Sequence, residues 1–356
     1  MILKQIGSLL VLRLWLALQR QDGWLCIFLK EASGFMEEAI RDFPKQFGWK
    51  PKIENESRWR QSQKYILCGM GGSHLAGDIF QSVYPDSNLS VYQDYGLPIW
   101  QKVVLDNAFV IASSYTGNTE ETLSTFQEAI QKGYSAAVLS TGGDLIEMAK
   151  KEGVSYIQMP NKGIQPRVAL GFSFLALAKM MGREDVLKEA WSLTTRLNPD
   201  ASRKSAQEIV KRLEGKVPVI YSSNRNRAVA YNWKIKFNET GKIPTFSNVF
   251  PELNHNEMNG FDITDSTKEL ARPFFFIFLR DAEDHPRIRK RMEVLERQFH
   301  DRGLPVMAID LEGNSRLERI FSSLLLADWT AFGIAKHYGR DPEQVPMIEE
   351  FKKLIG

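Results

Sequence analysis

A cluster of hydroxyl side chains over residues 113–121, with the sequence SSYTGNTEE, has the composition of an anion-binding turn. An apolar run over 108–112 precedes it, and a helical pattern over 120–131 follows. A strand that turns into a helix through small hydroxylated residues offers backbone N–H groups, hydroxyls and a positive helix end to one phosphate group. The same residues also fit a plain helix start with Thr119 as the N-cap. Both interpretations stay open on this segment alone.

A second small-residue segment, GMGGSHLAGD over residues 69–78, follows the apolar run from Lys64 to Cys68. Glycines that follow a strand let the backbone approach a ligand closely. The spacing is not GxGxxG with a downstream acidic residue, so it does not indicate a dinucleotide site. A strand-to-helix turn that needs glycine for its own geometry explains one or two of these glycines. It explains three glycines in four positions, followed by Ser73, less well.

Short apolar runs alternate with helical patterns along both halves of the chain, which predicts doubly wound α/β domains with parallel sheets. The strand candidates are 64–68, 89–92, 108–112, 136–139, 154–158, 217–221, 274–279 and 305–309. The helix candidates are 120–131, 144–152, 167–181, 227–238, 286–302 and 317–338. In such sheets ligands bind beyond the carboxyl ends of the strands, where both small-residue segments are expected to lie. Their convergence at one edge favours the phosphate interpretation.

A charged helical segment over 182–215 separates the two alternating patterns and marks the domain junction. We therefore expect domains over 36–195 and 196–356. Residues 1–35 do not fit this plan. The apolar run from Ser8 to Leu18 is interrupted by Arg13 and is too short to span a bilayer. Because a clean helical pattern begins at Met36, we interpret residues 1–35 as an extension or a misassigned start.

Composition narrows the class of partner. A chain of 356 residues with a net charge of +3 and no block of basic residues does not indicate nucleic-acid binding. Two cysteines form no disulfide framework and fit a cytoplasmic location, and no membrane association is expected. The five histidines show no zinc-ligand spacing, so no metal and no cofactor are expected.

The second half contains an unusually polar stretch that includes Glu239 and, after a proline, the loop PELNHNE over 251–257. A carboxylate and an imidazole can act as a base and a proton shuttle, so Glu239 and His255 are candidates for proton transfer. The alternative is two surface residues on a solvated loop, since sequence spacing does not show that they meet.

Three motifs in this order resemble the bifunctional phosphoglucose/phosphomannose isomerases. They are GMGGS at 69–73, SYTGNTEET at 114–122 and PELNHNE at 251–257, and the resemblance covers about residues 36–356. It implies two sugar isomerase (SIS) domains in tandem. The first two motifs are shared among sugar-phosphate-binding SIS proteins, whereas the third is much more specific.

The resemblance also implies roles for particular residues. The sugar phosphate would be held by Gly71, Gly72, Ser73, Ser114, Thr116 and Thr119. Arg167 would stabilise the charge of an enediolate, and Glu239 would move a proton between C1 and C2. His255 would assist ring opening and would come from the neighbouring subunit of a homodimer. Lys352, or its neighbour Lys353, matches a C-terminal active-site lysine.

Two departures from the family pattern are Thr240 in place of an asparagine and His74 in place of a small apolar residue, and the latter is expected to affect the phosphate pocket. The activity implied is metal-independent interconversion of glucose 6-phosphate and mannose 6-phosphate with fructose 6-phosphate through a cis-enediol. The alternatives are a non-catalytic sugar-phosphate-binding SIS protein and an isomerase restricted to glucose 6-phosphate. The first is weakened because the sequence has no helix-turn-helix segment that would report sugar-phosphate binding to DNA. An aminotransferring SIS enzyme would need a glutaminase domain with an N-terminal cysteine, which the sequence lacks.

Overall fold

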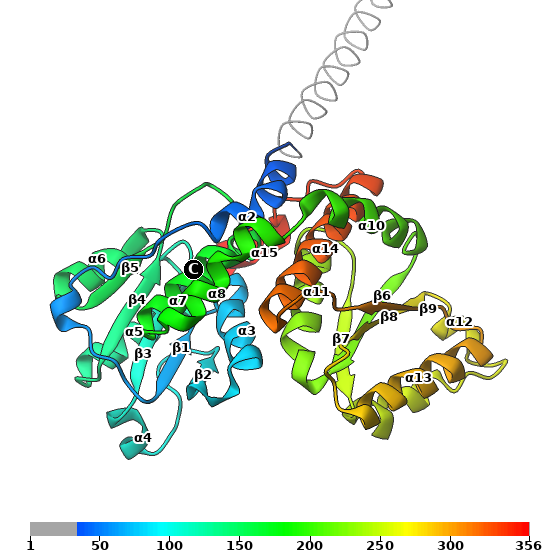
Figure 1. Ribbon diagram of the computed structural model, residues 1–356, viewed down its shortest axis with the longest axis horizontal. Helices are drawn as coiled ribbons and strands as arrows, with labels where there is room; N and C mark the ends of the chain where they lie inside the picture. Colours follow the sequence, from blue (N-terminus) through cyan, green and yellow to red (C-terminus); the bar gives the residue numbers. More distant parts are fainter. Residues whose placement is uncertain (1–33, 356) are drawn as a thin grey trace, which may run out of the picture.

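A computed structural model describes residues 34–355, which form two parallel sheets separated by a layer of helices (Figure 1). The first sheet has the order β2-β1-β3-β4-β5. Its strands are β1 (Tyr65–Cys68), β2 (Leu89–Tyr92), β3 (Phe109–Ser113), β4 (Ala136–Ser140) and β5 (Ser155–Gln158). The second sheet has the order β7-β6-β8-β9. Its strands are β6 (Val217–Ser223), β7 (Phe246–Phe250), β8 (Phe274–Arg280) and β9 (Val306–Asp310).

Alternate residues of the central strands face different cores, which is why these strands read as continuous apolar runs. In β1, Leu67 belongs to a core that includes Phe174, whereas Ile66 belongs to another that includes Phe126. Ile220 and Tyr221 of β6 divide in the same way. Each sheet is therefore covered on both faces, and the predicted α/β class with two parallel sheets is confirmed.

The helices that matter most for the site are α3 (Leu75–Val83), α7 (Leu170–Met180), α11 (Arg227–Glu239) and α14 (Arg316–His337). They lie between the two sheets (Figure 1) and pack on one another. The predicted helix over 167–181 begins later, because the turn η4 (Pro166–Val168) precedes α7. Arg167 therefore lies in a tight turn at the start of a buried helix.

The remaining helices either join the central core or cover the outer faces of the two sheets. They are α2 (Phe43–Gln46), α4 (Lys102–Asp106), α5 (Glu120–Gln131), α6 (Gly143–Glu152), α8 (Glu184–Trp191), α9 (Leu193–Arg196), α10 (Pro199–Arg212), α12 (Lys268–Ala271), α13 (Pro286–Asp301) and α15 (Pro346–Ile355). The predicted boundary at 195/196 falls near the end of α9 and stays a prediction. On its two sides, α9 packs on α2 and α10 packs on α14.

One hydrophobic core runs through both halves. The ring of Phe321 in α14 lies 4.8 Å from that of Phe47 and 5.4 Å from that of Phe174 in α7. Edge-on aromatic packing of this kind adds about 0.5–1.5 kcal/mol per pair beyond the area it buries. The helix layer therefore holds the two sheets in a fixed relation, which a site shared between them requires.

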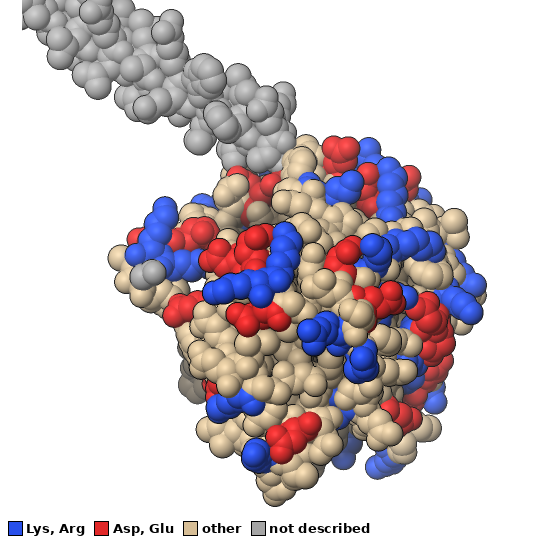
Figure 2. All heavy atoms as spheres, turned by 90° about the vertical axis from the view of Figure 1, so that its left-hand side faces the viewer, with Lys and Arg blue, Asp and Glu red and all other residues tan. Residues whose placement is uncertain are grey.

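The prediction for residues 1–35 falls outside the described residues, except for positions 34 and 35, which begin a helix over 34–41. Within the described residues, no helix has the length and apolar content needed to cross a bilayer. Figure 2 shows acidic and basic side chains interspersed on one face of the first half, without a broad area of one sign.

Candidate active site

The two small-residue loops interlock at the carboxyl edge of the first sheet. They follow the neighbouring strands β1 and β3, where the chain order of the sheet reverses. Ser113 Oγ donates to the carbonyl of Ser73 at 3.1 Å, and Ser73 Oγ accepts from Tyr115 N at 2.9 Å. The 3₁₀ turn η2 (Gly71–Ser73) is therefore fixed to the loop after β3. The structure brings the loops together at the switch point, where α/β sheets bind ligands.

The hydroxyls of Ser114 and Thr119 shape the second loop. Their oxygens lie 2.8 Å apart, and Ser114 Oγ also accepts from Gly117 N at 3.0 Å. Thr119 is at the N-cap position of α5, as the alternative interpretation predicts, but its side chain accepts no hydrogen bond from the helix backbone. Ser114 is fully buried, whereas Thr116 is exposed and Thr119 is half-buried. Thr116 and Gly71, with the half-buried Thr119 and Gly72, thus form the solvent-facing part of the predicted phosphate set.

Gly72 connects the first loop to the turn that carries Arg167. A Cβ at this position would lie 2.9 Å from Pro166 Cβ and 3.0 Å from Arg167 N. Such contacts are too short for any other residue without a backbone shift. Gly71 has a different requirement, because its φ of +51° is one that side-chain-bearing residues rarely adopt. The two glycines let the loop turn directly beside Arg167.

Arg167 and Glu239 meet between the two halves of the chain. Glu239 is the last residue of α11, and its Oε2 lies 3.3 Å from Arg167 Nη1. The Arg167 side chain is only 1% exposed, whereas that of Glu239 is 26% exposed. The carboxylate is therefore accessible while its cationic partner is held inside the protein.

The other donors of Arg167 are all occupied. Nε donates to Thr240 Oγ1 at 2.7 Å, and Nη2 donates to the carbonyls of Pro342 and Glu343 at 2.8 and 2.9 Å. Burial lowers the pKa of the guanidinium, and the carboxylates of Glu239, Asp328 and Glu343 oppose that shift. An arginine keeps its proton in proteins, so the site holds a fixed positive charge beside Glu239.

A buried ion pair beneath the turn holds the backbone of Arg167. Lys236 Nζ lies 2.6 Å from Asp328 Oδ1 and donates to the carbonyl of Arg167 at 3.0 Å. Both side chains are 1% exposed. Sequence reasoning gave no role to Thr240, Lys236 or Asp328. A signal for Asp328 does exist, since it is an acidic residue within the apolar pattern of α14.

His255 lies elsewhere in the same chain. It is exposed in η6 (Glu252–His255), and its side chain makes no hydrogen bond or ion pair with any other described residue. It lines a hollow of about 530 Å³ whose other residues include Asn259 and Arg302 but not Glu239 or Arg167. Glu257 anchors this loop to the second sheet by accepting from the Tyr221 hydroxyl at 2.5 Å. The structure thus does not bring His255 to Glu239 within one chain.

Lys352 is also not in contact with Arg167 or Glu239. It lies in α15, where its Nζ is 2.9 Å from Glu349 Oε1, and its side chain is 62% exposed. Lys353 is also exposed. No residue of α15 is buried, so neither lysine is held against the core.

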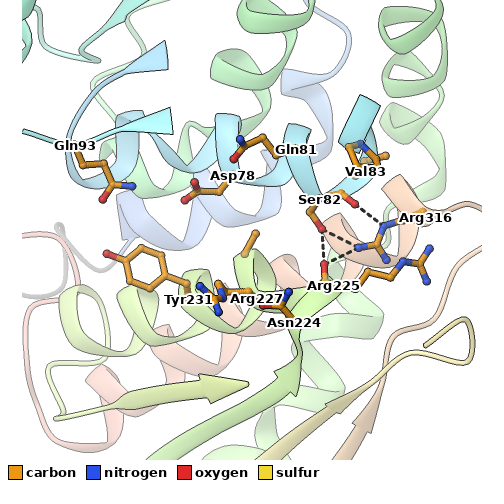
Figure 3. Close-up of a pocket in the computed structure, with 12 residues that line it drawn as sticks. Asp78, Gln81, Ser82, Val83, Gln93, Asn224, Arg225, Arg227, Tyr231 and Arg316 are labelled. Carbon is orange, nitrogen blue, oxygen red and sulfur yellow. Dashed lines mark hydrogen bonds between the residues drawn. The ribbon is translucent and has the colours of Figure 1, made fainter. Parts of the chain in front are cut away.

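A separate cavity of about 900 Å³ lies between α3 and the segment formed by η5 (Asn224–Asn226) and α11 (Figure 3). Arg316 closes one end, where it donates to Ser82 Oγ at 2.8 Å and to the Arg225 carbonyl at 2.9 Å. Near the other end, the buried imidazole of His74 lies 2.8 Å from Asp78. None of the predicted site residues lines this cavity.

Among the described residues, no group of three or more His, Cys, Asp and Glu side chains is arranged as metal ligands.

Comparison with known proteins agrees with this architecture. Tagatose-6-phosphate ketose/aldose isomerase from Escherichia coli superimposes with a TM-score of 0.63 at 17% identity, covering 86% of this chain and 94% of that one. The fold is thus that of the phosphosugar isomerases built from SIS domains. Residues 202–355 match the family model described as bacterial phospho-glucose isomerase C-terminal SIS domain.

Sequence relatives narrow the class further. The bifunctional phosphoglucose/phosphomannose isomerase of Aquifex aeolicus is 33% identical over 90% of this chain and 99% of its own length. The relative of the same name from Thermoplasma acidophilum is 38% identical over 82% of this chain and 89% of its own length. The chain belongs to the bifunctional phosphoglucose/phosphomannose isomerase family, as its motifs predict.

Proposed function

We propose that this protein is an aldose–ketose isomerase that interconverts glucose 6-phosphate and mannose 6-phosphate with fructose 6-phosphate in the cytoplasm. The observation that carries the proposal is the Arg167–Glu239 contact of 3.3 Å beside the interlocked loops. Isomerisation through a cis-enediol needs a carboxylate near the C1 and C2 protons and a cation near the developing oxyanion. This pair supplies both, and no redox step is required.

In this scheme the loops hold the phosphate and thereby place C1 and C2 near Glu239. The hydroxyls of Thr116 and Thr119 and the backbone of 71–73 face the phosphate, while Ser114 keeps the second loop in shape. Glu239 takes the proton from one carbon and returns it to the other. Arg167 stabilises the enediolate oxygen, and its buried anchors keep it from moving with the charge.

His255 would complete the site from a second copy of the chain. Its exposure, and its place in a hollow that includes neither Glu239 nor Arg167 of the same chain, support that assignment. It would protonate the ring oxygen to open the cyclic sugar. Lys352 in α15, or its neighbour Lys353, would be a C-terminal active-site lysine.

Coupled assays with each hexose 6-phosphate test the function. We expect turnover of glucose 6-phosphate and of mannose 6-phosphate, each to fructose 6-phosphate. Turnover of glucose 6-phosphate alone would show an isomerase restricted to that substrate. Binding without turnover of either hexose phosphate would contradict the proposal. The control variant Glu269→Gln changes an exposed carboxylate in α12 and should keep full activity.

Mixing two inactive variants tests the shared site. Subunits carrying Glu239→Gln and subunits carrying His255→Ala would form one intact site in each mixed dimer. We expect activity to return when the two are mixed and allowed to exchange. No recovery in verified mixed dimers would contradict the supply of His255 by the partner.

A further inference from the structure

The segment Asp341–Gln344, here called the strap, passes over the Arg167–Glu239 pair between α14 and α15. Arg167 binds it through two carbonyls, as described above, although the sequence places the strap far from η4. A charged side chain that spends two donors on backbone carbonyls fixes the course of that backbone. The strap is thus part of the site's construction.

Lys242 provides a second attachment for the strap. Its Nζ donates to the carbonyl of Glu239, at the end of α11, and to the carbonyl of Gln344. The last carbonyls of a helix have no partner within it, and a cation there also interacts favourably with the helix dipole. One ammonium group therefore joins the residue that carries the proposed base to the strap.

Lys242 has an uncommon backbone conformation. Its φ of +60° is left-handed, which is uncommon for residues other than glycine and carries a small conformational cost. The adjacent Gly241 is close-packed, because a Cβ there would lie 2.7 Å from the Phe237 carbonyl. This turn after α11 directs Lys242 back over the helix end.

The charges around Lys242 come from every element that meets there. Arg167 lies in η4, Glu239 in α11, and Arg340 and Asp341 in the segment that follows α14. Burial, together with the charges of Arg167 and Arg340, lowers the pKa of the Lys242 ammonium to about 8, while Asp341 and Glu239 oppose that shift. The group is charged at neutral pH and loses its proton under mildly alkaline conditions.

The strap leads directly into α15, which carries Lys352 and begins at Pro346. The apolar side chains of α15 are largely exposed, with Met347 at 83%, Phe351 at 60% and Leu354 at 78%. Because no residue of this helix is buried, its placement depends on the segment that connects it to α14.

We propose that Lys242 is a positioning residue whose ammonium group holds the strap against the end of α11, and so sets where Glu239 and α15 stand relative to each other. The proposal rests on the isomerase activity proposed above. Lys242 itself need not touch the substrate, since both of its bonds go to backbone carbonyls.

Steady-state kinetics of Lys242→Met and Lys242→Arg across pH test the proposal. We expect Lys242→Met to lower kcat by about ten- to a hundredfold with a smaller change in KM, because small displacements of catalytic groups have effects of this size. Arginine keeps its charge, so Lys242→Arg should restore much of kcat. The wild type should lose activity above a pH of about 8, and in Lys242→Arg this loss should occur at higher pH. The matched control Lys290→Met, at an exposed ion pair on α13, should behave as the wild type.

Wild-type kcat in Lys242→Met, or an unshifted alkaline limb in an active Lys242→Arg variant, would overturn the proposal. Hydrogen–deuterium exchange provides a readout that does not depend on turnover. We expect Lys242→Met to speed exchange over 341–355 while the strands of both sheets keep their protection. Unchanged exchange there would contradict the strap attachment even if the wild type proved inactive as an isomerase.

Discussion

Thr240 Oγ1 accepts a hydrogen bond of 2.7 Å from Arg167 Nε, directly beside the residue that we propose as the base. The contact links the turn after β5 in the first half to the end of α11 in the second. Because Thr240 is 1% exposed, water does not replace this acceptor if the hydroxyl is lost. The threonine, where the resemblance implies an asparagine, thus makes a structural contact to Arg167.

Removing that hydroxyl should loosen Arg167. Thr240→Val keeps the shape but leaves a buried guanidinium N–H without an acceptor, which costs about 1–3 kcal/mol. We expect this loss in the free energy of unfolding measured with urea, together with a lower kcat. Thr240→Ser retains the hydroxyl and should recover most of both. Equal behaviour of the valine and serine variants would show that the hydrogen bond is unimportant.

The buried ion pair of Lys236 and Asp328 makes a stability prediction. Lys236→Met leaves the Asp328 carboxylate without a cation in the core, and breaking such a pair costs about 3–5 kcal/mol. Urea unfolding should show this loss. The double variant Lys236→Met, Asp328→Leu removes both charges and should regain part of it. A single variant as stable as the wild type would contradict the account.

Gly72→Ala tests the close contact between the first loop and η4. The new methyl group would meet Pro166 Cβ at 2.9 Å, so the loop or the Arg167 turn must move. We expect KM for fructose 6-phosphate to rise about tenfold or more, because the first loop and Arg167 would no longer be spaced to contact the same substrate molecule. Gly260→Ala adds a methyl group in open space and serves as the control. Unchanged kinetics of Gly72→Ala would argue against the loop's role.

Glu343 makes a prediction about pH and stability. Burial, together with the nearby charge of Asp341, raises the pKa of its carboxyl to about 6, while Arg167 opposes that shift. The folded protein then binds this proton more tightly than the unfolded chain, so stability falls as the pH rises from about 4.5 through about 6. Glu343→Gln should therefore raise Tm relative to the wild type at about pH 7 and have little effect at about pH 4. The opposite pattern would show that the charged form is the stabilising one.

The fold was predictable from sequence because buried parallel strands leave a strong signal, as in the fully buried β1 and β3. The edge strand β7 was not predicted. Its sequence, FSNVF, combines an exposed Phe246 with polar Ser247 and Asn248, so it lacks a continuous apolar run. A central strand, covered on both faces, could not carry these residues without cost.

The candidate site also contains residues that the sequence predicts and residues that it does not. Local composition predicted the two loops and named Glu239 as a candidate base, and family resemblance added Arg167. The groups that hold them could not be predicted, because Lys236, Asp328 and the strap meet Arg167 only through tertiary packing. Sequence spacing also gives no reason for Lys242 to return to the end of α11, which depends on its left-handed backbone.

Proton exchange at C1 and C2 of the substrate reports directly on the role of Glu239 as the base. In heavy water the wild type should place deuterium on fructose 6-phosphate at C1, as detected by proton NMR, because Glu239 exchanges its proton with solvent during turnover. Glu239→Gln keeps the size of the side chain and a hydrogen-bond acceptor for Arg167, so it should still bind fructose 6-phosphate but incorporate no deuterium. Incorporation by Glu239→Gln at the wild-type rate would show that Glu239 is not the base.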